Sequence, residues 1–149
     1  MRALVQRVRS ASVEVEGRVV GAIGHGLLVF LGVAPDDGPD EVRYIASKIH
    51  GLRVFDDDAG RMNRSIGDVA GAVLLVSQFT LYADTRRGRR PSFDGAAAPA
   101  HAQSEYAAVA DALRALGLSV ETGIFQAHML VALVNDGPVT LMLESDRRN

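Results

Sequence analysis

The stretch Asn135-Asp136-Gly137-Pro138-Val139-Thr140 is the part of the sequence around which we expect the fold to be organised. An apolar run, residues 129–134, precedes it, and apolar and polar side chains alternate over residues 139–144. Two strands joined by Asn-Asp-Gly-Pro are typical of a hairpin, because these residues tolerate the backbone angles of a tight reversal. The sequence therefore predicts a hairpin over residues 129–144.

Pro138 is unusual in such a hairpin. It lies where the second strand should already donate hydrogen bonds, and proline has no N–H to donate. One interpretation, which the periodicity favours, is that the second strand starts one residue later. The alternative is a rigid Gly137-Pro138 tip that presents backbone groups to a ligand.

The rest of the chain predicts a mixture of strands and helices. Alternating or short continuous apolar runs indicate strands at 2–9, 12–16, 18–20, 27–31 and 73–76. Apolar side chains at helical spacing indicate one helix from Pro39 to Gly51 and a second from about Pro99 to Gly117. These elements together predict an α+β fold, with largely antiparallel sheets curled toward a barrel and two amphipathic helices.

Length and composition bound the class of protein. The chain has 149 residues, which makes one domain over residues 1–149 the default. No apolar run approaches the roughly 18 residues that a membrane span needs, and residues 1–7 lack the apolar core of a signal peptide. We therefore expect a cytoplasmic protein with no membrane partner.

The sequence offers little for metal or triad chemistry. Cysteine is absent, which excludes thiolate catalysis, and the four histidines are scattered without metal-ligand spacing. The acidic turn at residues 56–60 lacks the glycine and glutamate of a calcium loop. We expect no metal and no cofactor. Of the histidines, His128 is the one to examine, because it lies beside the strand that approaches the Gly137-Pro138 tip.

Ser77 and Thr80 are the candidate nucleophiles, and each would need a base. The Gly-x-Ser-x-Gly elbow of many hydrolases is absent around Ser77. Periodicity favours a strand end in which Phe79 and Leu81 enter the core. The alternative is an extended segment whose exposed N–H groups hold a developing oxyanion, where one donor is worth about 2.7–4 kcal/mol.

Four arginines, Arg86, Arg87, Arg89 and Arg90, lie within one short segment. The net charge of −2 gives no global field for nucleic acid. The cluster is either a solvated loop or a phosphate-binding site, since the planar guanidinium suits phosphate, and the residues leave both interpretations open.

Two motifs carry a resemblance to a known family. Ser77-Gln78-Phe79-Thr80-Leu81 together with Asn135-Asp136-Gly137-Pro138-Val139-Thr140 resembles the paired motifs of the D-aminoacyl-tRNA deacylases, the D-Tyr-tRNA deacylase family. The resemblance extends through Gln6-Arg7-Val8, Gly26-Leu27-Leu28, Met62-Asn63, Arg90-Pro91-Ser92-Phe93 and Thr122-Gly123. It covers the chain up to the polar tail, Glu144 to Asn149, with no departure inside the motifs.

The resemblance implies a homodimer that hydrolyses the ester between a D-amino acid, or glycine, and the ribose at the 3′ end of tRNA. It implies that the catalytic pocket is lined by Ser77, Gln78, Phe79 and Thr80. The Gly137-Pro138 tip, with a cis peptide bond, would enter the partner subunit's pocket as a chirality filter, and Met129 would help to wall that pocket. The ribose 2′-hydroxyl would assist the attacking water, while Thr80 either positions the substrate or acts as nucleophile.

The same resemblance makes tRNA the expected partner of Arg86, Arg87, Arg89 and Arg90, and no DNA is expected. Two other function classes remain open. A serine or threonine esterase for small esters would need a histidine close to Ser77 or Thr80. A non-catalytic RNA-binding module would bind tRNA through the arginines without consuming it.

Overall fold

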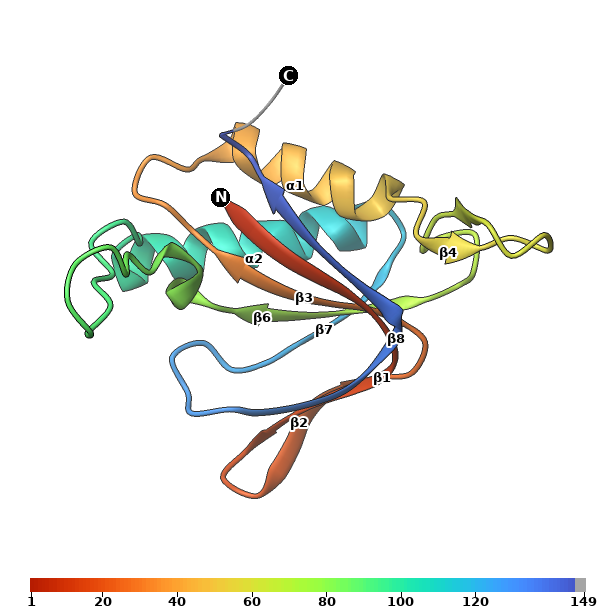
Figure 1. The fold of residues 1–149 in the computed structure, drawn as a ribbon, viewed down its shortest axis with the longest axis horizontal. Helices are drawn as coiled ribbons and strands as arrows, with labels where there is room; N and C mark the ends of the chain where they lie inside the picture. Colours follow the sequence, from red (N-terminus) through yellow and green to blue (C-terminus); the bar gives the residue numbers. More distant parts are fainter. Residues whose placement is uncertain (147–149) are drawn as a thin grey trace.

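β1 (Arg2–Val15) runs through the middle of the fold in a computed structural model that describes residues 1–146 (Figure 1). The other strands are β2 (Arg18–Ile23), β3 (Gly26–Gly32), β4 (Phe55–Asp56), β5 (Met62–Arg64), β6 (Ala72–Ser77), β7 (Ser119–Thr122) and β8 (Leu130–Glu144). The helices are α1 (Pro39–Gly51), the short 3₁₀ helix η1 (Phe79–Tyr82) and α2 (Pro99–Ala115).

β1 is paired on both of its edges. β8 runs antiparallel along one edge, while β3 and then β2 pair antiparallel with the other. The parallel pairs β3–β6 and β6–β7 extend the sheet, so its strand order is β2-β1-β3-β6-β7 with β8 attached to β1. β4 and β5 form a separate antiparallel hairpin.

The sheet curls until β2 returns to β7. A Cβ atom on Gly21 of β2 would lie 2.5 Å from the carbonyl oxygen of Thr122 in β7, so the two strands touch backbone to backbone. A small apolar core that includes Val13, Leu28 and Leu74 fills the curl, and α1 and α2 cover the opposite face over a larger core (Figure 1). The predicted α+β fold with a barrel-like sheet is confirmed.

The two helices have the predicted starts. Pro39 opens α1, where the carboxylate of Glu41 accepts a hydrogen bond from the N–H of Gly38 at 2.9 Å. Pro99 opens α2, and Gly117 takes a positive φ of 89° just beyond the end of that helix. These boundaries depend on local chemistry, so the sequence predicts them well.

The predicted hairpin is wrong, because residues 130–144 form one continuous strand. On β1 a single residue, Arg7, separates Val8 from Gln6, whereas residues 136–139 separate their partners Asn135 and Thr140 on β8. The Asn-Asp-Gly-Pro segment is therefore a bulge in a paired strand. The same residues favour turns and bulges, and the pairing with β1 decides between them. Gly137 has a φ of 127°, and the Gly137–Pro138 bond is cis, as the resemblance implied.

The polar tail was predicted to begin at Glu144. Glu144 is the last residue of β8, and the N–H of Ser145 donates to the carbonyl of Met1 at 2.9 Å. Residues 147–149, the end of the tail and of the predicted domain, lie outside the described residues. No helix within residues 1–146 is long and apolar enough to span a membrane.

Candidate functional site

A pocket of about 630 Å³ opens at the carboxyl end of β6. It lies between the start of η1, the first turns of α2 and the segment that leads into β8. Its walls include Ser77, Gln78, Phe79, Phe93, Pro99, Ala102, Phe125, His128 and Met129. The fold thus brings four of the predicted site residues, Ser77, Gln78, Phe79 and Met129, to one cavity.

η1 forms because the β3–β6 ladder ends at Ser77. The N–H of Gln78 still donates to the carbonyl of Leu31 at 2.8 Å, but the chain then turns into a single 3₁₀ turn, in which the N–H of Ala83 reaches the carbonyl of Thr80 at 3.0 Å. No residue of η1 is buried, and Phe79 is 54% exposed. The expectation that Phe79 and Leu81 enter the core is wrong: the turn leaves Phe79 exposed, and Leu81 is half-buried against Gly32 of β3, outside the core.

The start of η1 offers hydrogen-bond donors. The first N–H groups of a helix have no acceptor within the helix, and here they belong to Phe79 and Thr80. Thr80 itself is exposed and does not line the pocket, and its hydroxyl accepts a hydrogen bond from the Gln78 amide. This arrangement suits the stabilisation of an oxyanion at the pocket mouth.

The arginine segment is a loop closed at its base beside the pocket. Asp84 and Ser92 exchange two backbone hydrogen bonds of 2.7 and 2.9 Å, and the ring centroids of Phe79 and Phe93 lie 4.9 Å apart in an edge-to-face arrangement. The side chain and N–H of Arg86 bind Asp84 and lower the pKa of its carboxyl to about 2. The guanidinium of Arg86 is thus already neutralised.

Arg87, Arg89 and Arg90 are exposed in the same loop and form no ion pair with the described residues. Three unpaired guanidinium groups next to a pocket make a positively charged rim. Such a rim suits a polyanion that reaches into the pocket with one end.

Gly137 and Pro138 lie apart from the pocket of their own chain, whose walls do not include them. Arg7 holds this bulge. Its Nε donates to the carbonyl of Asp136 at 3.0 Å, and its Nη1 donates to the carbonyl of Val54 at 2.6 Å. The side-chain amide of Asn135 spans the bulge, donating to the carbonyls of Arg7 at 2.9 Å and Val139 at 3.0 Å.

Sequence reasoning did not single out Arg7 or Asn135 as supports of this bulge. A signal was present for Arg7, which shares its strand parity with the apolar residues Ala3 and Val5. In the structure Arg7 is indeed only 7% exposed. An arginine on the buried face of a strand requires hydrogen-bond partners. Its partners come from segments far away in the sequence, so they could not be named in advance.

The histidines do not complete a triad. His128 lines the pocket, yet among residues 1–146 no hydrogen bond joins a histidine to Ser77 or Thr80. The ring nitrogen of His101 instead contacts the carbonyl of Asp37 at 2.8 Å. Within the same range, no group of three or more potential ligand side chains is placed to hold a metal ion.

Comparison with known proteins gives consistent matches. The family described as D-Tyr-tRNA(Tyr) deacylase matches residues 4–144. A D-aminoacyl-tRNA deacylase from Koribacter versatilis is 58% identical over 147 residues, which cover 99% of each chain. The protein of that name from Deinococcus radiodurans is 58% identical over 144 residues, covering 97% of this chain and 99% of the relative.

Two solved structures share the fold. The c-Myc DNA Unwinding Element Binding Protein superposes with a TM-score of 0.91 at 40% identity, covering 97% of this chain and 99% of that one. A probable eukaryotic D-amino acid tRNA deacylase superposes with a TM-score of 0.81 at 18% identity, covering 95% and 97%, which supports the fold alone. By sequence, the chain belongs to the D-Tyr-tRNA(Tyr) deacylase family, and its enzyme class is that of hydrolases acting on carboxylic ester bonds.

Proposed function

We propose that this chain removes D-amino acids, and glycine, from the 3′ end of tRNA by hydrolysing the aminoacyl ester, as a step of translation proofreading in the cytoplasm. The observation that carries the proposal is the pocket itself. Its mouth offers the N–H groups at the start of η1, and its walls contain Ser77 and Gln78 without a bonded base. Family membership supplies the class of substrate.

The chemistry follows from these donors. Water attacks the ester carbonyl, and the N–H groups of Phe79 and Thr80 stabilise the oxyanion that forms. The ribose 2′-hydroxyl takes part in activating the water, and the 3′-oxygen leaves with a proton. The hydroxyl of Thr80, bonded to Gln78, orients the substrate rather than attacking it.

Discrimination against L-amino acids requires a second copy of the chain. Gly137 and Pro138 are exposed in the bulge of β8 and lie outside the pocket of their own subunit, so they are available to the pocket of a partner. There their backbone carbonyls accept hydrogen bonds from the ammonium group of the substrate, and Met129 forms the opposite wall of the pocket. A pocket closed in this way leaves no room for an L side chain.

The exposed apolar surface around β8 supports a homodimer. Leu130, Val134 and Met142 are 59%, 55% and 47% exposed, although they lie on a long strand of the main sheet. Large apolar side chains that stay exposed along one strand are candidates for a protein interface. A second copy that covers this surface would also carry its tip toward the pocket.

A comparison of substrates tests the proposal. Purified protein should release amino acid from D-Tyr-tRNA and Gly-tRNA, and leave L-Tyr-tRNA and a simple tyrosine ester largely intact. Equal rates on the D and L forms would contradict the filter. Cleavage of the simple ester at a comparable rate would favour a general esterase, and tRNA binding without release would favour a binding module.

DNA forms a separate arm of the same test, because a structural neighbour is named a DNA unwinding element binding protein. We expect tRNA, and not duplex DNA, to be the partner of the arginine loop. Duplex DNA of matched phosphate concentration should therefore fail to inhibit deacylation. Inhibition at that concentration would contradict the preference.

A further inference from the structure

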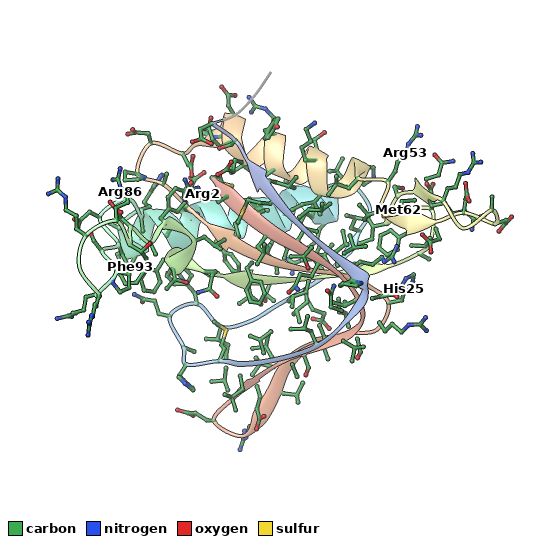
Figure 2. All side chains as sticks on the ribbon, in the orientation of Figure 1. Arg2, His25, Arg53, Met62, Arg86 and Phe93 are labelled. Carbon is green, nitrogen blue, oxygen red and sulfur yellow. The ribbon has the colours of Figure 1, made fainter. Side chains whose placement is uncertain are left out.

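Arg2, in β1, contacts η1 and the end of β8, and Figure 2 shows it on the same side of the molecule as Phe93, which lines the pocket. Its Nη1 donates to the carbonyl of Leu81, in η1, at 2.9 Å. Its guanidinium carbon lies 4.6 Å from the centre of the Tyr82 ring. Its Nε is 3.4 Å from a carboxylate oxygen of Glu144, at the end of β8. The two groups form an ion pair, but the Nε makes no hydrogen bond to the described residues.

η1 needs such support from outside. A single 3₁₀ turn does not hold its shape alone, and none of its residues is buried in the core. Its first attachment is to β3, where Gln78 donates to Leu31 and the turn rests on Gly32. A Cβ at Gly32 would lie 3.0 Å from the carbonyl oxygen of Gln78 and 3.2 Å from the Tyr82 ring.

Arg2 supplies a second attachment, to Leu81 and Tyr82 from the side of β1. Its planar guanidinium meets the Leu81 carbonyl, the Tyr82 ring and the Glu144 carboxylate together. A lysine ammonium has no flat face that could lie over the Tyr82 ring while one nitrogen donates to the Leu81 carbonyl. The orientation of η1 is therefore set by β3, which supports the turn along its length, and by Arg2, which binds its Leu81–Tyr82 end.

We propose that Arg2 is a positioning residue of the deacylation site, which fixes η1 so that the N–H groups of Phe79 and Thr80 point at the reacting carbonyl. This inference rests on the proposed function for the identity of the reaction. Arg2 does not touch substrate. It acts through the Leu81 carbonyl and the Tyr82 ring, and it controls the positions of the N–H groups that stabilise the oxyanion.

The kinetic experiment compares Arg2→Met, Arg2→Lys and the control Arg43→Met on D-Tyr-tRNA. Arg43 is an exposed arginine that pairs with Asp40 on α1. Arg2→Met should lower kcat by about tenfold to a hundredfold, because small misplacements of catalytic groups have effects of that order. KM should stay within about twofold, Arg2→Lys should regain part of kcat, and Arg43→Met should match the parent. Unchanged kcat, or a loss confined to KM, would overturn the proposal.

Hydrogen exchange gives a readout that needs no activity. The N–H of Ala83 donates to the carbonyl of Thr80 and reports the integrity of η1. In Arg2→Met, this amide should exchange about tenfold faster, since one hydrogen bond to a charged group is lost. The amide of Leu28, in the ladder between β1 and β3, should keep its rate. Unaltered exchange at Ala83, or equal acceleration at Leu28, would overturn the proposal that Arg2 fixes η1. Parent protein without deacylase activity would contradict the proposed function instead.

Discussion

At the scale of single residues, Thr80 is the side chain whose role decides the mechanism. Its hydroxyl is exposed and accepts a hydrogen bond from Gln78, with no bonded histidine to remove its proton. We expect Thr80→Ala to retain a substantial part of kcat on D-Tyr-tRNA, measured under single-turnover conditions. A fall in kcat by several orders of magnitude, which is typical of a lost nucleophile, would show instead that Thr80 attacks the ester and carries the acyl group.

Gly137 is a second residue whose identity matters. Its φ of 127° lies in a region that side chains rarely adopt, and an added Cβ would come within 2.9 Å of Nη2 of Arg7. Gly137→Ala should lower the free energy of unfolding by about 1–3 kcal/mol, measured by urea denaturation. Gly24→Ala is the matched control, since nothing lies within 4 Å of its Cβ position. Equal stability of the two variants would contradict this account.

At the scale of elements, the loop from Asp84 to Ser92 is closed at its base and exposes three arginines that are unpaired within residues 1–146. If it binds tRNA phosphates, replacing Arg87 or Arg89 by Gln should reduce the slope of log affinity against log salt by roughly 0.7–0.9 each. Arg86→Gln should reduce it less, because Asp84 already neutralises that guanidinium. Filter binding over a salt series measures the slopes. Equal slopes for all variants and the parent would show that the loop is solvated and does not contact tRNA phosphates.

The bulge of β8 depends on an element distant in sequence. Arg7 joins it to the residue that precedes β4, donating to the carbonyls of Asp136 and Val54. Arg7→Met leaves both carbonyls without their charged donor, so it should cost about 1.5–3 kcal/mol in urea denaturation. Arg9→Met serves as control, because Arg9 is 76% exposed and contacts Asp136 at 3.8 Å. A smaller loss for Arg7→Met than for the control would contradict the anchoring role.

At the scale of the whole molecule, the exposed apolar side chains of β8 point to assembly. Light scattering at micromolar concentration should report about twice the chain mass of 15.9 kDa. Val134→Glu should shift the protein toward monomer, because a charge in an apolar interface is costly. Leu116→Glu, at an exposed apolar residue just beyond α2, should leave the mass unchanged. A parent monomer with full selectivity would contradict the cross-subunit filter.

The sequence by itself determined the α+β class, the starts of both helices and the family. Pro39 and Pro99 are local signals, since the missing N–H of proline fits the first turn of a helix wherever it occurs. The motifs at residues 77–81 and 135–140 are likewise contiguous. The chemistry of neighbouring residues is enough for these predictions, so they needed no tertiary structure.

The tertiary structure alone decided what the polar groups between these elements do. Residues 136–139 make a bulge rather than a turn, because β1 pairs with β8 on both sides of them. Phe79 turns outward because the ladder ends at Ser77. Arg7 and Arg2 reach carbonyls that are 129 and 79 residues away. A hydrogen bond needs its partner within about 3 Å, and only the folded chain determines which distant group comes that close.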